Sequence, residues 1–135
     1  MNHKPILCLD FDGVIHRYDS GWKGAAVIPD DVTTGFFEWL DGAAQFFNIT
    51  IYSSRSSSPD AVQAMQFWLA AQRRKWRDAG GVSVVTDGTP VSITFATEKP
   101  PAFLTIDDRA LTFTGDWRDF DPAALRKFKP WNKRA

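Results

Sequence analysis

Cysteine is nearly missing from this chain of 135 residues, and neither sign of charge predominates. The one cysteine, Cys8, excludes an internal disulfide, and its place in an apolar run predicts a small buried side chain. The 16 basic and 16 acidic residues cancel, so the whole chain has no net attraction to nucleic acid or to an acidic membrane surface. Any polyanionic partner therefore has to be recognised by a local patch.

Long apolar runs are also missing. No stretch approaches the roughly 20 apolar residues that span a bilayer, and residues 1–5 are polar without the pattern of a signal peptide. We therefore expect no membrane partner and a cytoplasmic location. No repeat, low-complexity tract or obvious linker divides the sequence, and its length suits one domain, 1–135, with a core of its own.

Segments typical of strands and of helices alternate along the sequence. Helices are expected over 29–42, with Asp30 or Asp31 as the cap, and over 58–78, and a short final helix starts at 121. Segments with the composition of strands are 5–9, 47–52, 82–85, 91–97, 102–106 and, as an edge strand, 111–117. This alternation predicts an α/β fold of three layers, a Rossmann-like and mostly parallel sheet with helices on both faces.

Polar residues follow several of the expected strands directly. In open α/β sheets ligands bind outside the carboxyl ends of the strands, so we expect these side chains to meet at one edge. They are Asp10 and Asp12 after the first strand, Ser53, Ser54 and Arg55 after the second, Asp107 and Asp108 after a later one, and Lys99 on the loop before that strand.

Several carboxylates at one sheet edge repel each other unless a cation offsets their charge. Hard oxygen ligands suit Mg²⁺, which also accepts a phosphate oxygen. Lys99 and Arg55 could bind further phosphate oxygens, the Ser53 hydroxyl could donate to another, and backbone amides near Phe11 and Gly13 could complete the cradle. The pattern therefore predicts a site for a phosphorylated substrate.

The spacing of the first two aspartates suits phosphoryl transfer. A carboxylate such as Asp10 can attack phosphorus and form an aspartyl-phosphate. Asp12, two residues on, can protonate the leaving oxygen as an acid and then activate water as a base. Gly13 lets the backbone leave the strand sharply. Asp10 and Asp12 are therefore the expected catalytic pair.

These residues resemble the four motifs of the haloacid dehalogenase (HAD) superfamily. Asp10-Phe11-Asp12-Gly13-Val14 resembles the first motif, Ser53 the second, Lys99 the third and Asp107-Asp108 the fourth, in family order and over almost the whole chain. The resemblance implies Asp10 as nucleophile and metal ligand, and Asp12 as general acid/base with its backbone carbonyl on the metal. It also implies Asp108 as a direct Mg²⁺ ligand and Asp107 as one acting through water.

Within that superfamily the acid at position 12 favours a phosphatase. The sequence leaves no room for a full cap domain, which implies a capless member with an open site. The runs around Ser53 and Asp108 are also similar to those of the 3′-phosphatase domain of phage polynucleotide kinase. This resemblance makes a nucleotide or a nucleic-acid end the leading substrate expectation.

Several alternatives stay open at this point. Ser54 competes with Ser53 for the functional position, and Arg55 could be an ordinary surface residue. The basic cluster 73–77 is better explained by its place at a helix C-terminus than by nucleic-acid binding, while the basic tail 126–134 fits either reading. A non-catalytic binding or regulatory module that has kept the fold is the main alternative function. A receiver-like phosphoacceptor is disfavoured, because its aspartate belongs on a later strand.

Overall fold

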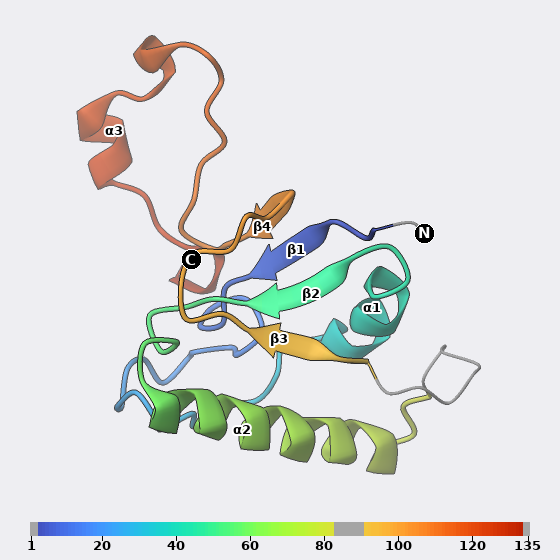
Figure 1. The fold of residues 1–135 in the computed structure, drawn as a ribbon. Helices are drawn as coiled ribbons and strands as arrows, with labels where there is room; N and C mark the ends of the chain where they lie inside the picture. Colours follow the sequence, from blue (N-terminus) through green and yellow to red (C-terminus); the bar gives the residue numbers. More distant parts are fainter. Residues whose placement is uncertain (1–2, 83–90, 134–135) are drawn as a thin grey trace.

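The computed structural model describes residues 3–82 and 91–133. Their centre is a four-stranded open sheet in the order β3-β2-β1-β4, and every neighbouring pair is parallel (Figure 1). The strands are β1 (Ile6–Leu9), β2 (Asn48–Ile51), β3 (Ile93–Phe95) and β4 (Leu104–Ile106). The predicted α/β class with a parallel sheet is confirmed, and the arrangement is consistent with a Rossmann-like fold.

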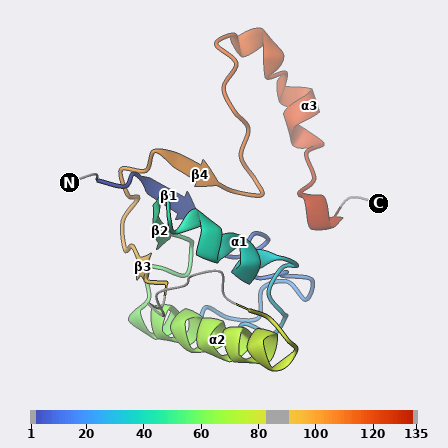
Figure 2. The ribbon, with the colours of Figure 1, turned by 90° about the vertical axis from the view of Figure 1, so that its right-hand side faces the viewer.

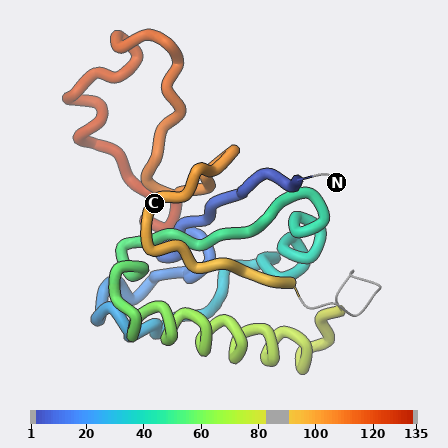
Figure 3. Tube along the Cα trace, viewed as in Figure 1, coloured from blue at the N-terminus to red at the C-terminus, as the bar shows by residue number. Residues whose placement is uncertain are grey.

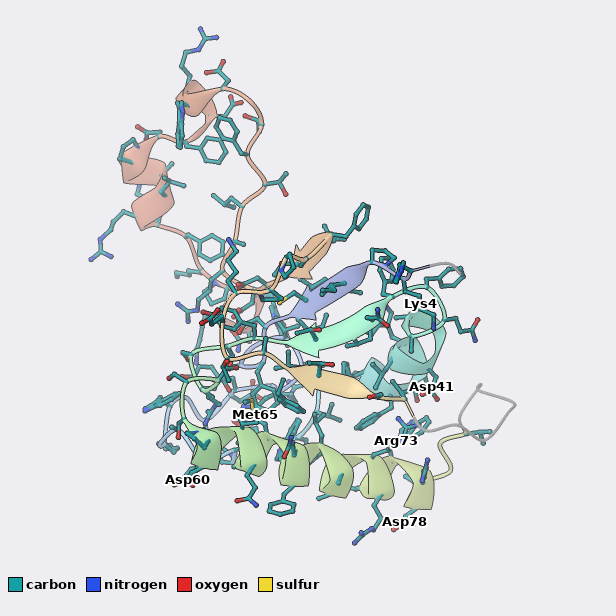
Figure 4. The ribbon with its side chains drawn as sticks, viewed as in Figure 1. Lys4, Asp41, Asp60, Met65, Arg73 and Asp78 are labelled. Atoms are coloured by element: carbon teal, nitrogen blue, oxygen red, sulfur yellow. The ribbon has the colours of Figure 1, made fainter. Side chains whose placement is uncertain are left out.

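One face of the sheet carries the core. Leu7 pairs with Ile49 and Leu9 with Ile51, and all four side chains are buried. The helices α1 (Phe36–Ala43) and α2 (Pro59–Asp78) both pack on this face, through residues such as Leu40 and Met65. An ion pair of 3.2 Å between Arg73 of α2 and Asp41 of α1 joins the two helices (Figure 4). This contact supports a structural role for part of the basic cluster 73–77.

Helix α2 begins and ends where the sequence predicts. The Ser58 hydroxyl accepts a hydrogen bond from the amide of Ala61, and Pro59 occupies the first helical position. None of the helices in the described ranges combines the length and the apolar character that crossing a bilayer requires.

The predicted start of the preceding helix at Pro29-Asp30 is wrong. Residues 29–35 are irregular, and α1 begins only after Gly35. Val32 instead forms an antiparallel bridge with His16. The Asp30 carboxylate, the expected cap, accepts hydrogen bonds from the amide and hydroxyl of Ser20. Tertiary pairing with the loop after β1 therefore takes these residues away from the helix.

The second helical layer that we predicted is not seen in the described residues. The chain moves from β1 to β2 to β3 in one direction, so two right-handed crossovers place α1 and α2 on the same face (Figure 2). A helix on the other face would have to come from the crossover between β3 and β4. That crossover, 96–103, contains no helix, which leaves Cys8, Thr50 and their neighbours without a helix above them.

After β4 the chain forms a pendant C-terminal lobe, residues 109–133. The predicted edge strand 111–117 is wrong, because this segment is extended but pairs with no described strand. It leads into three short helices: η1 (Trp117–Asp119), α3 (Pro122–Arg126) and η2 (Trp131–Lys133). The lobe stands away from the sheet beyond β4 (Figure 3). Of the candidate strand 82–85, residues 83–85 lie outside the described residues.

Candidate active site

Three aspartates converge at the carboxyl edge of the sheet, where all four strands end (Figure 1). The amide of Asp10 donates to the carbonyl of Ile106 over 3.0 Å, so the end of β1 is tied to the end of β4. Asp107 and Asp108 follow Ile106 directly. As a result, carboxylate oxygens of Asp10, Asp107 and Asp108 lie within 4.8 Å of one another. Two strands distant in sequence thus form one acidic cluster, as predicted.

The electrostatics of this acidic cluster suit a cation. Burial, together with the charges of Asp107 and Asp108, raises the pKa of Asp10 to about 7, although the amide of Phe11 donates to its carboxylate. Burial also raises the pKa of Asp108. The Asp108 side chain is 4 % exposed, and its Oδ1 has no hydrogen-bond partner among residues 3–82 and 91–133. A hard divalent cation would satisfy that oxygen and remove the repulsion between the carboxylates.

Gly13 allows Asp108 to reach the site. Its φ of 81° lies in the left-handed region, and a Cβ built there would overlap Oδ2 of Asp108. Any other residue would therefore collide with the carboxylate as well as strain the backbone. The glycine of the Asp-x-Asp-Gly pattern has a steric role in addition to the turn for which we predicted it.

The Asp12 carboxylate is not part of the acidic cluster. It binds Nδ1 of His16 at 2.9 Å and Nε of Arg55 at 2.9 Å. Burial alone would raise the pKa of Asp12, but the hydrogen bonds from His16 and Arg55 outweigh it and hold that pKa below its usual value. Asp12 is therefore an ionised base next to the cluster, and its carboxylate is not among the converging ligand oxygens. The expected contact of its backbone carbonyl with a metal stays a prediction.

His16 is fully buried and is fixed as one tautomer by its neighbours. Its Nε2 accepts the backbone N–H of Asp30 at 3.1 Å, so the proton of a neutral ring is on Nδ1, which donates to Asp12. The ring packs edge-on against Trp68. In the sequence His16 is only a histidine on an expected loop, and nothing beyond its four-residue spacing from Asp12 indicates the contact between them.

The Arg55 side chain is more buried than we expect for an arginine that binds substrate at an open surface. Its side chain is fully buried. Its Nε binds Asp12, its Nη1 donates to the carbonyls of Gly24, Ala25 and Val27, and the Trp22 ring covers its guanidinium at 4.6 Å. The surface-arginine alternative is wrong. What the structure shows for Arg55 is a clasp between Asp12 and the loop 13–28, while its contact with substrate stays a prediction.

The two backbone amides expected to cradle phosphate are already used within the protein. The amide of Phe11 donates to Oδ1 of Asp10 at 2.8 Å, and that of Gly13 donates to the carbonyl of His16 at 2.8 Å. The Phe11 side chain is fully buried in the core. In this structure the turn satisfies both donors itself, and the phosphate cradle expected at Phe11 and Gly13 stays a prediction.

The remaining expected ligands lie on the loops that follow β2 and β3. Ser53 accepts the amide of Arg55 at 3.1 Å, which leaves its hydroxyl proton able to donate elsewhere. Ser54 is exposed in the same turn. Lys99 is exposed on the loop between β3 and β4, and it forms no hydrogen bond or ion pair with the described residues. Their roles in phosphate binding stay predictions.

The C-terminal end of the lobe also reaches this edge. Trp131 Nε1 donates to the carbonyl of Gly13 at 2.6 Å, and Asn132 Nδ2 donates to the carbonyl of Arg17 at 3.0 Å. Between Lys129 and Trp131, Pro130 is buried. Our sequence analysis missed this contact because the residues are over 100 positions apart, and the only signal was a tryptophan outside every expected element.

Comparison with family models, with curated proteins and with solved structures finds no match for this chain. The chemistry of the site therefore has to be inferred from its own geometry. Three carboxylates able to hold a divalent cation lie beside an ionised carboxylate that is held by a histidine and an arginine. Such a site can bind a cation with an anionic ligand and can accept a proton.

Proposed function

We propose that this protein is a Mg²⁺-dependent phosphomonoesterase of the HAD type that forms an aspartyl-phosphate on Asp10. The observation that carries the proposal is the meeting of Asp10 with Asp107 and Asp108, in which a buried oxygen of Asp108 has no hydrogen-bond partner in the described part of the chain. Asp12, ionised and fixed two residues after the nucleophile, supplies the base that such a reaction needs.

Asp10 and Asp108 would hold Mg²⁺ directly, with the exposed Asp107 acting through water. Bound there, the ion would neutralise the three carboxylates and polarise a phosphoryl oxygen. Lys99 and Ser53 would bind further phosphoryl oxygens. Lys99 forms no ion pair with the acidic residues that the structure describes, so none of these neutralises its charge, which supports this assignment.

In the first step an oxygen of Asp10 forms a bond to phosphorus while the bond to the leaving-group oxygen breaks, and protonated Asp12 gives its proton to that oxygen. In the second step water attacks phosphorus, the bond to Asp10 breaks, and Asp12 takes the proton of the water. The lowered pKa keeps Asp12 ionised and so able to accept this proton, although it also makes the carboxylate a weaker base. To protonate the leaving-group oxygen of the first step, Asp12 has to take up a proton from solvent beforehand, and its low pKa makes that uptake harder as pH rises.

The substrate class follows from the openness of the site. No cap covers the acidic cluster in the described residues, which favours a substrate whose bulk remains outside the protein. A nucleotide or the phosphorylated end of a nucleic acid is the leading candidate, in line with the resemblance of the Ser53 and Asp108 runs to a nucleic-acid 3′-phosphatase.

The test is hydrolysis of an aryl phosphate and of a panel of nucleoside monophosphates in Mg²⁺. We expect Asp10→Asn to abolish turnover with the fold intact by circular dichroism, and Asp60→Asn, an exposed aspartate at the start of α2, to behave as wild type. Wild-type protein that binds Mg²⁺ in calorimetry but hydrolyses no phosphate ester would overturn the proposal in favour of a binding module.

A further inference from the structure

The C-terminal lobe is attached to the candidate site at both of its ends. It leaves the site directly after Asp108, and it returns through the hydrogen bonds from Trp131 to Gly13 and from Asn132 to Arg17. Residues 109–129 are therefore a closed excursion and not a free tail. The excursion begins and ends at residues next to the acidic cluster.

The lobe presents aromatic rings to solvent. Phe113 lies 4.9 Å from Trp117 and 5.5 Å from Phe120 between ring centroids, and we call these three rings the aromatic platform. Trp117 is 78 % exposed and Phe113 is 52 % exposed. No residue of η1, α3 or η2 is buried. Large rings held in place but left open to solvent are typical of binding surfaces.

Positive charge is concentrated in the same part of an otherwise neutral chain. Residues 109–135 hold seven of the 16 lysines and arginines but only three of the 16 acidic residues. Those three aspartates are already engaged within the lobe. Asp116 binds Arg118, Asp119 accepts from the Thr114 hydroxyl, and Asp121 accepts the amide of Ala124 at the start of α3. The lobe thus combines open rings with an excess of cations.

We propose that the lobe binds single-stranded nucleic acid whose terminal phosphate occupies the acidic site. Bases would stack on the aromatic platform, and backbone phosphates would contact cations such as Arg126 and Lys127. A duplex does not fit this recognition, because its bases are already stacked on one another. The inference rests on the proposed phosphatase function and deepens it, since it names an oligonucleotide end, rather than a free nucleotide, as the substrate.

The first test compares a short oligothymidylate carrying a terminal 3′-phosphate with thymidine 3′-monophosphate. We expect Trp117→Ala and Phe113→Ala to lower kcat/KM for the oligonucleotide about 5- to 150-fold, the range that loss of one base stack implies. The mononucleotide should be hydrolysed as by wild type. Phe67→Ala, an exposed phenylalanine on α2, is the matched control. Equal losses on both substrates, or no loss on the oligonucleotide, would overturn the inference.

The second test is independent of catalysis. Fluorescence anisotropy in EDTA measures binding of the same labelled oligonucleotide, and Arg126→Gln with Lys127→Gln should flatten the dependence of affinity on salt. Binding that needs Trp117, in a protein that hydrolyses nothing, would refute the phosphatase proposal but not the binding surface. If sedimentation instead shows a dimer that Trp117→Ala dissociates, with no oligonucleotide bound, the lobe is a protein interface and the inference fails.

Discussion

The indole Nε1 of Trp131 and the carbonyl of Gly13 are joined by a hydrogen bond of 2.6 Å across 118 positions of sequence. Gly13 is the residue against which Asp108 lies, so the anchor of the lobe and the acidic cluster share one backbone turn. This arrangement links the position of the lobe to the geometry of the site.

Trp131→Phe keeps an aromatic side chain but removes the indole N–H that donates to Gly13. Because a typical intramolecular hydrogen bond contributes about 0.5–1.5 kcal/mol, we expect amide hydrogens of residues 109–133 to exchange roughly 2- to 10-fold faster, with exchange in α2 unchanged. Hydrogen–deuterium exchange with mass spectrometry measures both. Trp117→Phe, which alters a ring of the lobe without touching the anchor, should leave exchange as in wild type. Unchanged exchange in Trp131→Phe would mean that the lobe is held by other contacts.

Gly13→Ala tests the steric role of the turn. The left-handed conformation costs a non-glycine residue about 1–2 kcal/mol, and the new Cβ would also displace the Asp108 carboxylate. We expect Mg²⁺ affinity, measured by calorimetry, to fall well below that of wild type. Gly35→Ala is the matched control, because its φ is 83° and nothing lies within 4 Å of a Cβ there. If both variants bind Mg²⁺ equally, the close approach of Gly13 and Asp108 has no functional meaning.

Arg55→Met tests the buried clasp. Removing one partner of a buried ion pair leaves an uncompensated charge and costs about 3–5 kcal/mol, so the midpoint of urea unfolding should fall. Adding Asp12→Asn should recover part of the loss, since the stranded carboxylate is then neutral. Arg118→Met breaks a pair whose arginine is 91 % exposed, and it should leave the midpoint unchanged. A midpoint equally insensitive to Arg55→Met would show that the clasp does not stabilise the fold.

The raised pKa of Asp10 makes stability depend on pH and on Mg²⁺. The folded protein binds this proton up to about pH 7, whereas the unfolded chain releases it near 3.8. The free energy of unfolding therefore falls as pH rises through that window in EDTA. Asp10→Asn should melt about 2–8 °C above wild type at pH 8 and like wild type below pH 4. Mg²⁺ should raise the wild-type melting temperature more at pH 8 than at pH 5, as circular dichroism can measure. A Mg²⁺ effect that is the same at both pH values would contradict the assignment of Asp10 as a ligand.

Local signals in the sequence predicted the elements that depend on local chemistry. The Ser58 cap with Pro59 correctly predicted the start of α2, and the apolar run before Asp10 correctly predicted β1. Both predictions succeeded because such signals act within a few residues. The same reasoning failed at Pro29-Asp30, where pairing of Val32 with His16 overrides an equally good local start signal.

The candidate site was predictable as far as topology determines it. Parallel strands bring their carboxyl ends together, so the meeting of Asp10 with Asp107 and Asp108 follows from the order of elements. The burial of Arg55 and the tautomer of His16 do not follow, because both depend on how the loop 13–28 folds back over Asp12. The hydrogen bond between Trp131 and Gly13 could not be predicted either, since no periodicity or spacing in the sequence indicates a contact between its two ends.

The position of β4 in the sheet sets the order in which the site can be completed. Among β1, β2 and β3, strands that are neighbours in the sheet are also consecutive in the sequence, and α1 and α2 connect them. Strand β4, in contrast, pairs with β1, which lies about 100 residues earlier in the sequence. A growing chain can therefore assemble the apolar core while the acidic cluster still lacks two of its three carboxylates. Metal affinity should appear only once the last strand has docked, so a nascent chain stays inert toward Mg²⁺ until its core is already built.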